Sequence, residues 1–390
     1  MTVALIAGLL FIAGSTAQAS WLFVIAAGVL GLVFGSLFMR HHLKNAEVVR
    51  TVPRRGRVGD DMRVGLRASN GGARPLPLFR LSDSFGAFDH SAVLVERLKP
   101  GEEAHVELVK SARRRGVFSA AAVTLTTGAP FGFLRSTRTI DVASDLVVVP
   151  RWVELKSFPI LEPSSYPADV LHERARTGAG EEFIGVREYR PGDPPRAVHW
   201  RSTARAGRLV VREFEEEVAS RVSLVLAGAD VGVPPDSAYE TLVSAVASIG
   251  IYALQTGHPV ELLRAGPRGE IVRIADPDRF SLLEWLAQAQ PIDAPLGPLV
   301  AASIGRSRRR GTVVLFSPSS GIAAASVPEA VRSAQSAGCR AIVIGARSST
   351  WADHGDRTML KDTSFDQLPG GRAAVRMLSR DDDLARCIGS

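Results

Sequence analysis

Two long apolar stretches open the chain. Val3–Gly14 contains no polar residue, and Trp21–Met39 contains only Ser36. The second stretch has 19 residues, just enough for a helix to cross about 30 Å of hydrocarbon. Neither stretch has a polar face, which disfavours a buried pair of helices in a water-soluble domain. The pattern predicts a transmembrane helical hairpin over residues 1–39.

The residues between the two stretches allow a second interpretation. Ala17-Gln18-Ala19 has the small-x-small form of a secretory cleavage site. However, no basic residue precedes the first stretch, and the second stretch follows at once. These two features favour the hairpin over a cleaved leader.

Positive charge follows the second stretch, whereas the short link between the stretches has no charge. The basic residues are Arg40, His41, His42, Lys44, Arg50, Arg54, Arg55 and Arg57. The positive-inside bias therefore predicts a two-pass plasma-membrane protein with the bulk of the chain in the cytoplasm. Contact of these arginines with anionic lipid headgroups is a further interpretation, although their role in topology is enough to explain them.

Short alternating strands dominate residues 40–150. The runs are Met62–Ala68, Ala92–Leu98, His105–Val109, Ala122–Thr126 and Leu146–Val149. Turn clusters such as Asn70-Gly71-Gly72 separate them. This regular spacing predicts an all-β, immunoglobulin-like sandwich.

A connector and an unusual segment occupy residues 151–217. Three prolines mark the connector, and the charged, glycine-rich stretch Gly180–Arg212 also holds aromatic residues that favour burial. Phe183–Tyr189 is predicted to be a strand, followed by a turn. Asp193 and Pro194 then suggest a helix over Pro194–Ala204 that Gly207 closes.

From residue 218 to residue 390, strand-like and helical stretches alternate. Predicted strands are Val222–Ala227, Val260–Arg264, Ile271–Ile274, Thr312–Ser317 and Arg340–Gly345; predicted helices are Ala238–Gln255, Pro277–Ala289 and Pro328–Ala337. Such alternation predicts an α/β, Rossmann-like domain with a mostly parallel sheet.

The formal net charge of +7 raises the question of a polyanionic partner. The charge is mostly arginine interleaved with acids, so solvated faces and ion pairs are favoured over nucleic-acid binding. Cys339 and Cys387 are the only cysteines. They have no metal-binding spacing and form no disulfide framework, which fits a reducing compartment.

One pattern identifies a family. The stretch G-x-E-F-x-G-V-R-E-Y-x-x-G-D-x-x-R-x-V-H-W-x-x-T-A-R, read from Gly180 to Arg205, resembles the signature of the family catalogued as domain of unknown function 58. The resemblance implies a von Willebrand A-like domain for the C-terminal part. It also implies a protein partner, a MoxR-type AAA+ ATPase or a transglutaminase-like membrane protein, but no established reaction.

Metal-binding von Willebrand A domains carry an Asp-x-Ser-x-Ser loop after the first strand, because magnesium needs about six hard oxygen ligands. The corresponding loop here is Ala227-Gly228-Ala229-Asp230-Val231. Its first carboxylate and both serines are missing. Ser317-Pro318-Ser319 also puts proline where an aspartate often helps. We therefore expect no metal and no cofactor.

The signature offers two function classes. Its charged and aromatic residues predict a rigid surface that binds a protein, in an adaptor for assembly, maturation or cell-envelope processes. The residues expected to carry this surface are Arg187, Tyr189, Gly192, Asp193, Arg196, His199, Trp200 and Arg205. The alternative is a hydrolase that uses His199 and Asp193, with Ser202 one helical turn away. A non-enzymatic protein is the favoured interpretation.

Overall fold

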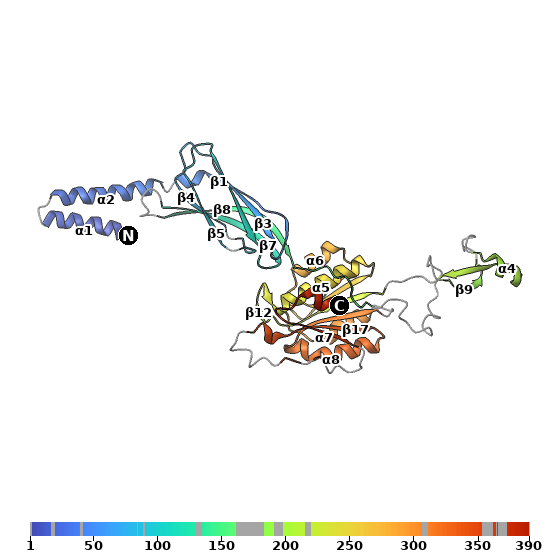
Figure 1. Cartoon of the computed structure of the whole chain (residues 1–390). Coiled ribbons are helices and arrows are strands. Elements are labelled where there is room, and N and C mark those ends of the chain that lie inside the picture. The colour runs from blue at the N-terminus through green and yellow to red at the C-terminus, as the bar shows by residue number, and fades with distance from the viewer. Residues whose placement is uncertain are drawn as a thin grey trace. The chain divides into compact units, whose positions relative to one another are not determined.

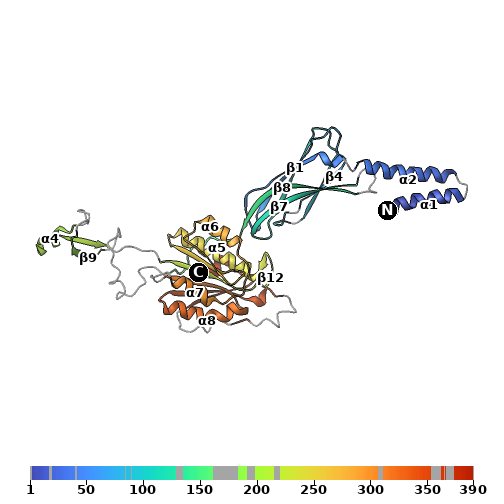
Figure 2. The same ribbon diagram turned by 180° about the vertical axis from the view of Figure 1, so that it is seen from behind.

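The computed structural model describes residues 2–16, 20–39, 42–83, 85–88, 90–128, 135–160, 183–190, 198–214, 220–305, 311–352, 362–363, 365 and 373–389. The chain divides into two compact units, Met1–Arg151 with Leu286–Gln288 and Trp152–Trp285 with Ala289–Ser390. Each unit has its own hydrophobic core. Figures 1 and 2 show their elements from opposite sides.

Two helices open the first unit and pack against each other. They are α1 (Thr2–Thr16) and α2 (Ser20–Met39). The rings of Phe11 and Phe23 meet edge to face with centroids 5.1 Å apart. The 15 residues of α1 extend about 22 Å at the usual rise of an α-helix.

This geometry corrects the first prediction. Among the residues that the structure describes, no helix reaches the length and apolarity that crossing a bilayer requires. A two-pass hairpin needs both arms to cross, and α1 falls short of the roughly 30 Å of hydrocarbon. The predictions of a transmembrane hairpin over residues 1–39 and of a plasma-membrane location with the bulk of the chain in the cytoplasm are therefore contradicted.

The rest of the first unit consists of two sheets. Its elements are η1 (His42–Asn45), β1 (Ala46–Thr51), β2 (Arg55–Arg57), β3 (Asp61–Asn70), β4 (Phe79–Asp83), β5 (Ser91–Val95), β6 (Glu103–Ser111), β7 (Gly116–Thr127) and β8 (Ser136–Val149). One sheet has the order β1-β3-β6 and the other β2-β8-β7-β4-β5. All pairs are antiparallel except β2 with β8.

Alternating burial shows how the two sheets pack. Along β3, every second residue is buried and the residues between them are exposed or half-buried. Because successive side chains of a strand point to opposite faces, one face of β3 is buried. Val48 and Leu66 of the first sheet share one core cluster with Phe79, Leu81 and Leu125 of the second. The two sheets therefore form a sandwich with their apolar faces inward.

A charged residue interrupts this apolar interior. Arg50 stands on the buried face of β1, and its Nη2 donates to Oδ1 of Asp83 on β4 over 2.6 Å. Both side chains are fully buried. The Nζ of Lys110 lies 3.9 Å from the other oxygen of Asp83. One carboxylate thus faces cations from two strands of the opposite sheet.

The guanidinium of Arg50 also donates hydrogen bonds at an irregularity in the pairing of β7 with β8. The register of β7 against β8 shifts between Ala120 and Ala122, as in a β-bulge. Arg50 donates to the carbonyl oxygens of Ala120, Ala122 and Val142 at 3.3, 3.1 and 2.8 Å. A fixed fork of donors is well suited to several carbonyls at once, so Arg50 joins the bulge to the facing sheet.

The second unit is built on a six-stranded sheet. Its strands are β11 (Val222–Leu226), β14 (Val260–Ala265), β15 (Ile271–Ala275), β16 (Thr312–Pro318), β17 (Arg340–Ala346) and β18 (Ala374–Leu378). Its helices are α5 (Ala238–Gln255), α6 (Arg279–Ala287), α7 (Leu296–Ile304), α8 (Gly321–Ser336) and α9 (Leu384–Ile388), with the short elements β12 (Gly232–Val233), β13 (Asp236–Ser237) and η4 (Ser348–Thr350). The sheet order is β15-β14-β11-β16-β17-β18. Only the edge strand β15 runs antiparallel to its neighbour.

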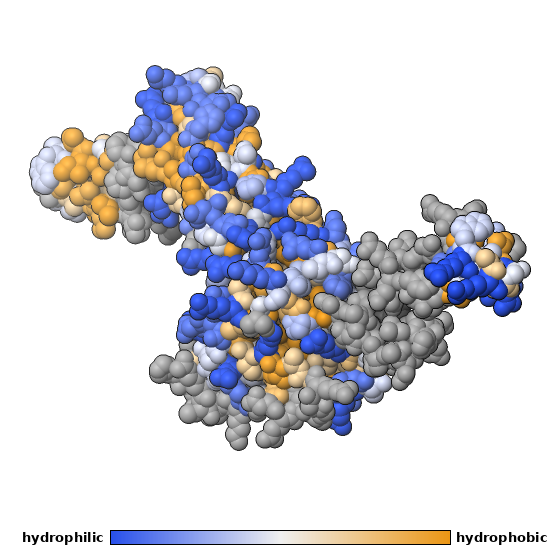
Figure 3. Space-filling model, turned by 45° about the vertical axis from the view of Figure 1, so that its right-hand side comes forward, coloured by the Kyte–Doolittle hydropathy of each residue, from blue (hydrophilic) through white to orange (hydrophobic). Residues whose placement is uncertain are grey.

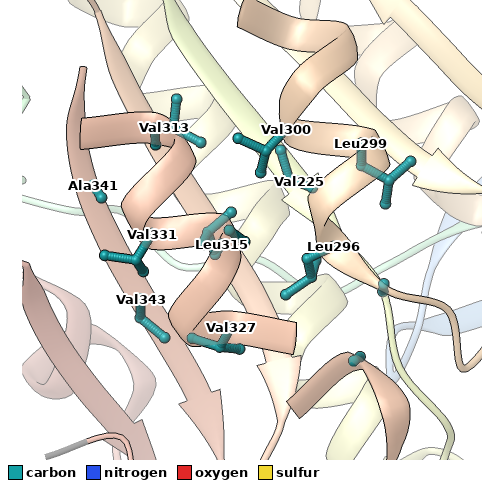
Figure 4. Close-up of a cluster of buried hydrophobic side chains, with 14 of the residues drawn as sticks. Val225, Leu296, Leu299, Val300, Val313, Leu315, Val327, Val331, Ala341 and Val343 are labelled. Atoms are coloured by element: carbon teal, nitrogen blue, oxygen red, sulfur yellow. The ribbon is translucent and has the colours of Figure 1, made fainter. Parts of the chain in front are cut away.

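Helices cover both faces of this sheet. Alternate residues such as Val225, Leu315 and Val343 pack with Leu299 of α7 and Val331 of α8 in one cluster (Figure 4). The helix α5 contacts β11, β14, β16 and β17. Each of the central strands is buried throughout, as expected for parallel strands between two helical layers.

We expect Arg50→Met to lower the free energy of unfolding of the first unit by about 3–5 kcal/mol, because it leaves the Asp83 carboxylate buried without its main partner. Chemical denaturation of the whole chain, followed by probes in each unit, measures this effect. Arg63→Met is the matched control, since Arg63 and Glu107 form an exposed pair 3.8 Å apart. The control should change stability by about 1 kcal/mol or less. Equal losses of unfolding free energy in the two variants would contradict a stabilising role of the buried Arg50–Asp83 pair.

Candidate functional site

The signature forms a small hairpin, which we call the signature hairpin (residues 183–190 and 198–214). It comprises β9 (Phe183–Glu188), α4 (Trp200–Ala206) and β10 (Val210–Phe214). β9 pairs antiparallel with β10, with Glu188 opposite Val210 and Arg187 opposite Val211. The strand predicted over Phe183–Tyr189 is confirmed to within one residue.

The helix of the hairpin begins later than the sequence predicts. Val198 makes a β-bridge with Val211, and the backbone N–H of His199 donates to the carbonyl of Val210 at 2.8 Å. A residue in a β-bridge cannot lie inside a helix, so the predicted start at Pro194 is wrong, whereas the helix is confirmed over Trp200–Ala204. The helix α4 begins at Trp200 instead.

His199 starts this helix as its N-cap. Its Nδ1 accepts from the backbone N–H of Ser202 at 3.3 Å and lies 2.7 Å from the Ser202 hydroxyl oxygen. The same N–H also donates to the carbonyl of His199 at 3.0 Å. Both the side chain and the backbone of His199 thus close the first turn of α4, as an N-cap residue does.

The other end of α4 is closed as predicted. Gly207 has a positive φ of 66°, and its N–H donates to the carbonyl of Thr203, which is the usual form of a glycine C-cap. The Thr203 hydroxyl accepts from the N–H of Val210 at 3.1 Å. These bonds fix α4 against β10.

The structure places five of the eight predicted site residues. Arg187, Tyr189, His199, Trp200 and Arg205 lie in the hairpin, whereas Gly192, Asp193 and Arg196 lie outside the described residues. Trp200 is 67% exposed, and Arg205 in the last turn of α4 is also exposed. Arg187 and Tyr189 are half-buried.

One further residue of this surface was missed by the sequence reasoning. Nη1 of Arg208 lies 3.3 Å from Oε2 of Glu188 in an exposed ion pair. The spacing of the two residues in the chain gives no sign of this contact. Their approach follows from the hairpin register, which places Glu188 opposite Val210.

The second candidate location is the carboxyl end of the large sheet. Ligands of open α/β sheets bind where the strand order reverses, which here lies between β11 and β16. Gly228 follows β11, and its N–H donates to the carbonyl of Ile292 at 2.9 Å. A Cβ on Gly228 would lie 2.1 Å from Cδ of Pro318. Among the described residues, the chain therefore packs closely against itself at Gly228.

Two aspartates near this point are engaged in capping. Asp293 accepts from the N–H groups of Ile322 and Ala323 in the first turn of α8, at 2.9 Å each. Asp230 accepts from the N–H of Tyr239 at the start of α5 over 3.2 Å. A carboxylate at a helix N-terminus occupies the place that a bound anion would take.

A cluster of hydroxyl groups lies at the ends of β16 and β17. Asp362 accepts hydrogen bonds from the hydroxyls of Ser319 and Ser349, and Ser319 Oγ accepts from the N–H of Ser348 at 2.9 Å. These groups satisfy one another. Within the described part of the chain, no three His, Cys, Asp or Glu side chains are grouped to hold a metal ion.

Cys387 is a weak candidate for a nucleophile. Burial, together with the negative charges of Asp382 and Asp383, raises the pKa of its thiol. A raised pKa lowers the fraction of reactive thiolate at neutral pH. This cysteine is therefore not activated for covalent chemistry.

A comparison with protein families matches the part of the chain that holds the signature hairpin and the carboxyl end of the large sheet. Residues 185–347 match a family model described as "Protein of unknown function DUF58". This part of the chain is thus similar to the DUF58 family. The match begins in β9 and ends just after β17, so it takes in the signature hairpin and most of the large sheet. The family predicted from the signature is confirmed.

Other comparisons add little to the DUF58 match. The search of curated proteins gave no match. Among solved structures, the CARDB domain of PF1109 from Pyrococcus furiosus is 14% identical, with 27% of this chain and 94% of that one covered and a TM-score of 0.20. A β-glucosidase from Listeria innocua is 15% identical, with 26% and 16% covered and a TM-score of 0.14. An exo-β-N-acetylglucosaminidase from Vibrio harveyi is 10% identical, with 77% and 57% covered and a TM-score of 0.16. Scores this low carry no argument about fold or function.

We expect Gly228→Ala to destabilise the DUF58 region by at least about 1–3 kcal/mol. Gly228 has a φ of 143°, which strains any other residue, and the new methyl group would overlap Pro318. Gly297→Ala is the control, because its Cβ meets nothing within 4 Å and alanine favours a helix. Thermal unfolding of the two variants measures the difference. A Gly228→Ala protein as stable as the control would show that the sheet edge is open.

Proposed function

We propose that this DUF58 protein is an adaptor that binds other proteins and works with a MoxR-type AAA+ ATPase in assembly, maturation or cell-envelope processes. The single observation that supports a binding role most is the filled sheet edge. Gly228, Ile292 and Pro318 occupy the point where an α/β domain ordinarily holds its ligand. The signature hairpin, by contrast, leaves Trp200 open to solvent.

The partner class comes from the family resemblance of the signature. Its relatives are associated with MoxR-type AAA+ ATPases and, in some cases, with transglutaminase-like membrane proteins. We also propose that the second unit is von Willebrand A-like. The strand order β15-β14-β11-β16-β17-β18 with one antiparallel edge strand supports this assignment. An adaptor needs a rigid surface, and the capped helix of the hairpin supplies one.

The second candidate is a hydrolase that uses His199 and Asp193. The distance of 2.7 Å between His199 Nδ1 and the Ser202 hydroxyl favours it, because a base and a nucleophile need such a contact. The same Nδ1 also accepts from the Ser202 backbone N–H. This second bond belongs to a helix cap, and the cap explains the short distance without catalysis.

Substitution of His199 separates the two candidates. Asparagine is a good N-cap residue, so His199→Asn should keep α4 and partner binding, whereas His199→Ala should weaken the helix by about 0.5–2 kcal/mol. Hydrogen exchange of the Ser202 and Thr203 amides, which both donate to the carbonyl of His199, measures whether the first turn of α4 is kept. If these amides stay protected in the His199→Asn chain but a hydrolytic activity of the unaltered chain is lost, the imidazole has a chemical role. The adaptor interpretation then fails.

Co-purification tests the proposed partner. The tagged full chain, expressed in its own cells and isolated under gentle conditions, should enrich a MoxR-type AAA+ ATPase over a tag-only control, as judged by quantitative mass spectrometry. The purified ATPase should then bind the purified chain directly. Repeated enrichment of other proteins without this ATPase, together with no direct binding, would refute the partnership.

A further inference from the structure

A stretch at the start of the second unit contacts the helices of this unit without forming a helix or a strand itself. We call it the strap (residues 152–160). Near its start, Cζ of Arg279 on α6 lies 4.5 Å from the centroid of the Trp152 ring. The backbone N–H of Val153 donates to the hydroxyl of Ser248 on α5 at 3.0 Å. These contacts hold the first part of the strap against two helices.

The second part of the strap meets the short helix α9. The Ser157 hydroxyl donates to the carbonyl of Gly389, directly after α9, at 2.8 Å. A Cβ on Gly389 would lie 3.6 Å from Cδ2 of Leu155, which is ordinary van der Waals contact. The helix α9 has five residues, of which Ile388 is buried. Because so short a helix is not stable by itself, its position depends on contacts of this kind.

One side chain of the large sheet joins the strap to α9. The guanidinium of Arg376 on β18 lies 6.0 Å from the ring centroid of Phe158, and Phe158 is buried. Nη1 of Arg376 also donates to the carbonyls of Cys387, at 3.2 Å, and of Ile388. These carbonyls lie in the last turn of α9, where a helix leaves its carbonyls without intrahelical partners. Loss of this guanidinium would therefore loosen the strap and α9 together.

The strap covers part of α5. Twelve of the 18 residues of α5 are buried, so this helix needs cover on more sides than the sheet provides. Ser248, which bonds to the strap, is 1% exposed. The strap itself carries the exposed Glu154 and Lys156, and hydrophilic and hydrophobic side chains both appear on the visible face of the second unit (Figure 3). Release of the strap would uncover the side of α5 that carries Ser248.

We propose that the strap and α9 open and close together as one local unit, and that their opening uncovers α5 at Ser248 while the large sheet stays folded. The contacts of Arg376 with both segments and the bond of Ser157 to Gly389 couple them. The central strands β11 and β16 are buried throughout and paired on both sides, so they open only at a higher free energy. The inference goes beyond the proposed adaptor function, because it gives the second unit a closed and an open form with different exposed surfaces.

A substitution in α9 tests the coupling. Asp383 caps α9 by accepting from the N–H of Ala385 at 3.0 Å. In the full chain, Asp383→Ala should raise hydrogen exchange in α9 by about 5-fold, the effect of a lost N-cap, and by the same factor in the strap. Mass spectrometry of peptides from the two segments measures both rates. Unchanged exchange in the strap would overturn the inference, and so would an equal acceleration in β11 and β16.

Two further variants complete this experiment. Asp293→Ala is the matched control, because Asp293 caps α8, which packs with Val225 on one face of the sheet, whereas Gly250 of α5 approaches Leu224 on the other. This control should leave exchange in the strap and in α9 unchanged. Arg376→Met should accelerate exchange in both segments by about 10-fold or more, because it removes hydrogen bonds from a charged group. Acceleration in only one of the two segments would show that they open separately.

Thiol labelling tests whether the opening uncovers α5. The thiol introduced by Ser248→Cys should react slowly with a maleimide, and addition of Asp383→Ala should raise its labelling rate by about 5-fold, because the reaction requires opening. Ser303→Cys is the control, since Ser303 on α7 is also buried and α7 packs with α8. Its labelling rate should not respond to Asp383→Ala. If the rate at position 248 does not respond either, the strap does not cover α5 and the inference fails.

Discussion

The close approach of the chain at the end of β11 is the constraint on which the functional interpretation depends. Gly228 lies so near Pro318 that no side chain fits between them, and its N–H is bound to the carbonyl of Ile292. Asp293, the next residue, then occupies the N-terminus of α8. Backbone and carboxylate of the same protein thus lie at the carboxyl end of the sheet, the end at which other α/β sheets bind ligands. A glycine permits this arrangement because its backbone tolerates a positive φ.

The signature hairpin differs from the rest of the chain in where its apolar side chains lie. The sandwich of the first unit and the large sheet of the second unit, with its helices, have apolar cores of their own. The hairpin instead combines a small buried interior with an exposed indole and several arginines. Secondary structure within it is held by caps at both ends of α4, so the surface is ordered by local bonds. A preformed surface loses less entropy on binding than one that must order first.

The sequence predicts those elements that local pattern determines. The strand at Val222 and the helix at Ala238–Gln255 follow from continuous apolar or amphipathic stretches, and β11 and α5 lie there. The local pattern does not predict features that depend on contacts between residues far apart in the chain. The bridge of Val198 with Val211 displaces the predicted helix start, and α8 begins at Gly321, with Pro328 inside it rather than at its start. Apolar content alone misled the prediction for residues 1–39, and the contact of Gly228 with Pro318 joins residues whose proximity no local pattern reveals.

The position of Arg50 has a consequence for the order in which the sandwich assembles. Its carbonyl acceptors lie 70, 72 and 92 residues further along the chain. A guanidinium buried before these acceptors exist would be both dehydrated and unsatisfied. Burial of Arg50 is therefore favourable only together with the β7–β8 pairing that supplies these acceptors. The place of β1 in the sandwich thus depends on residues that the ribosome adds long after β1.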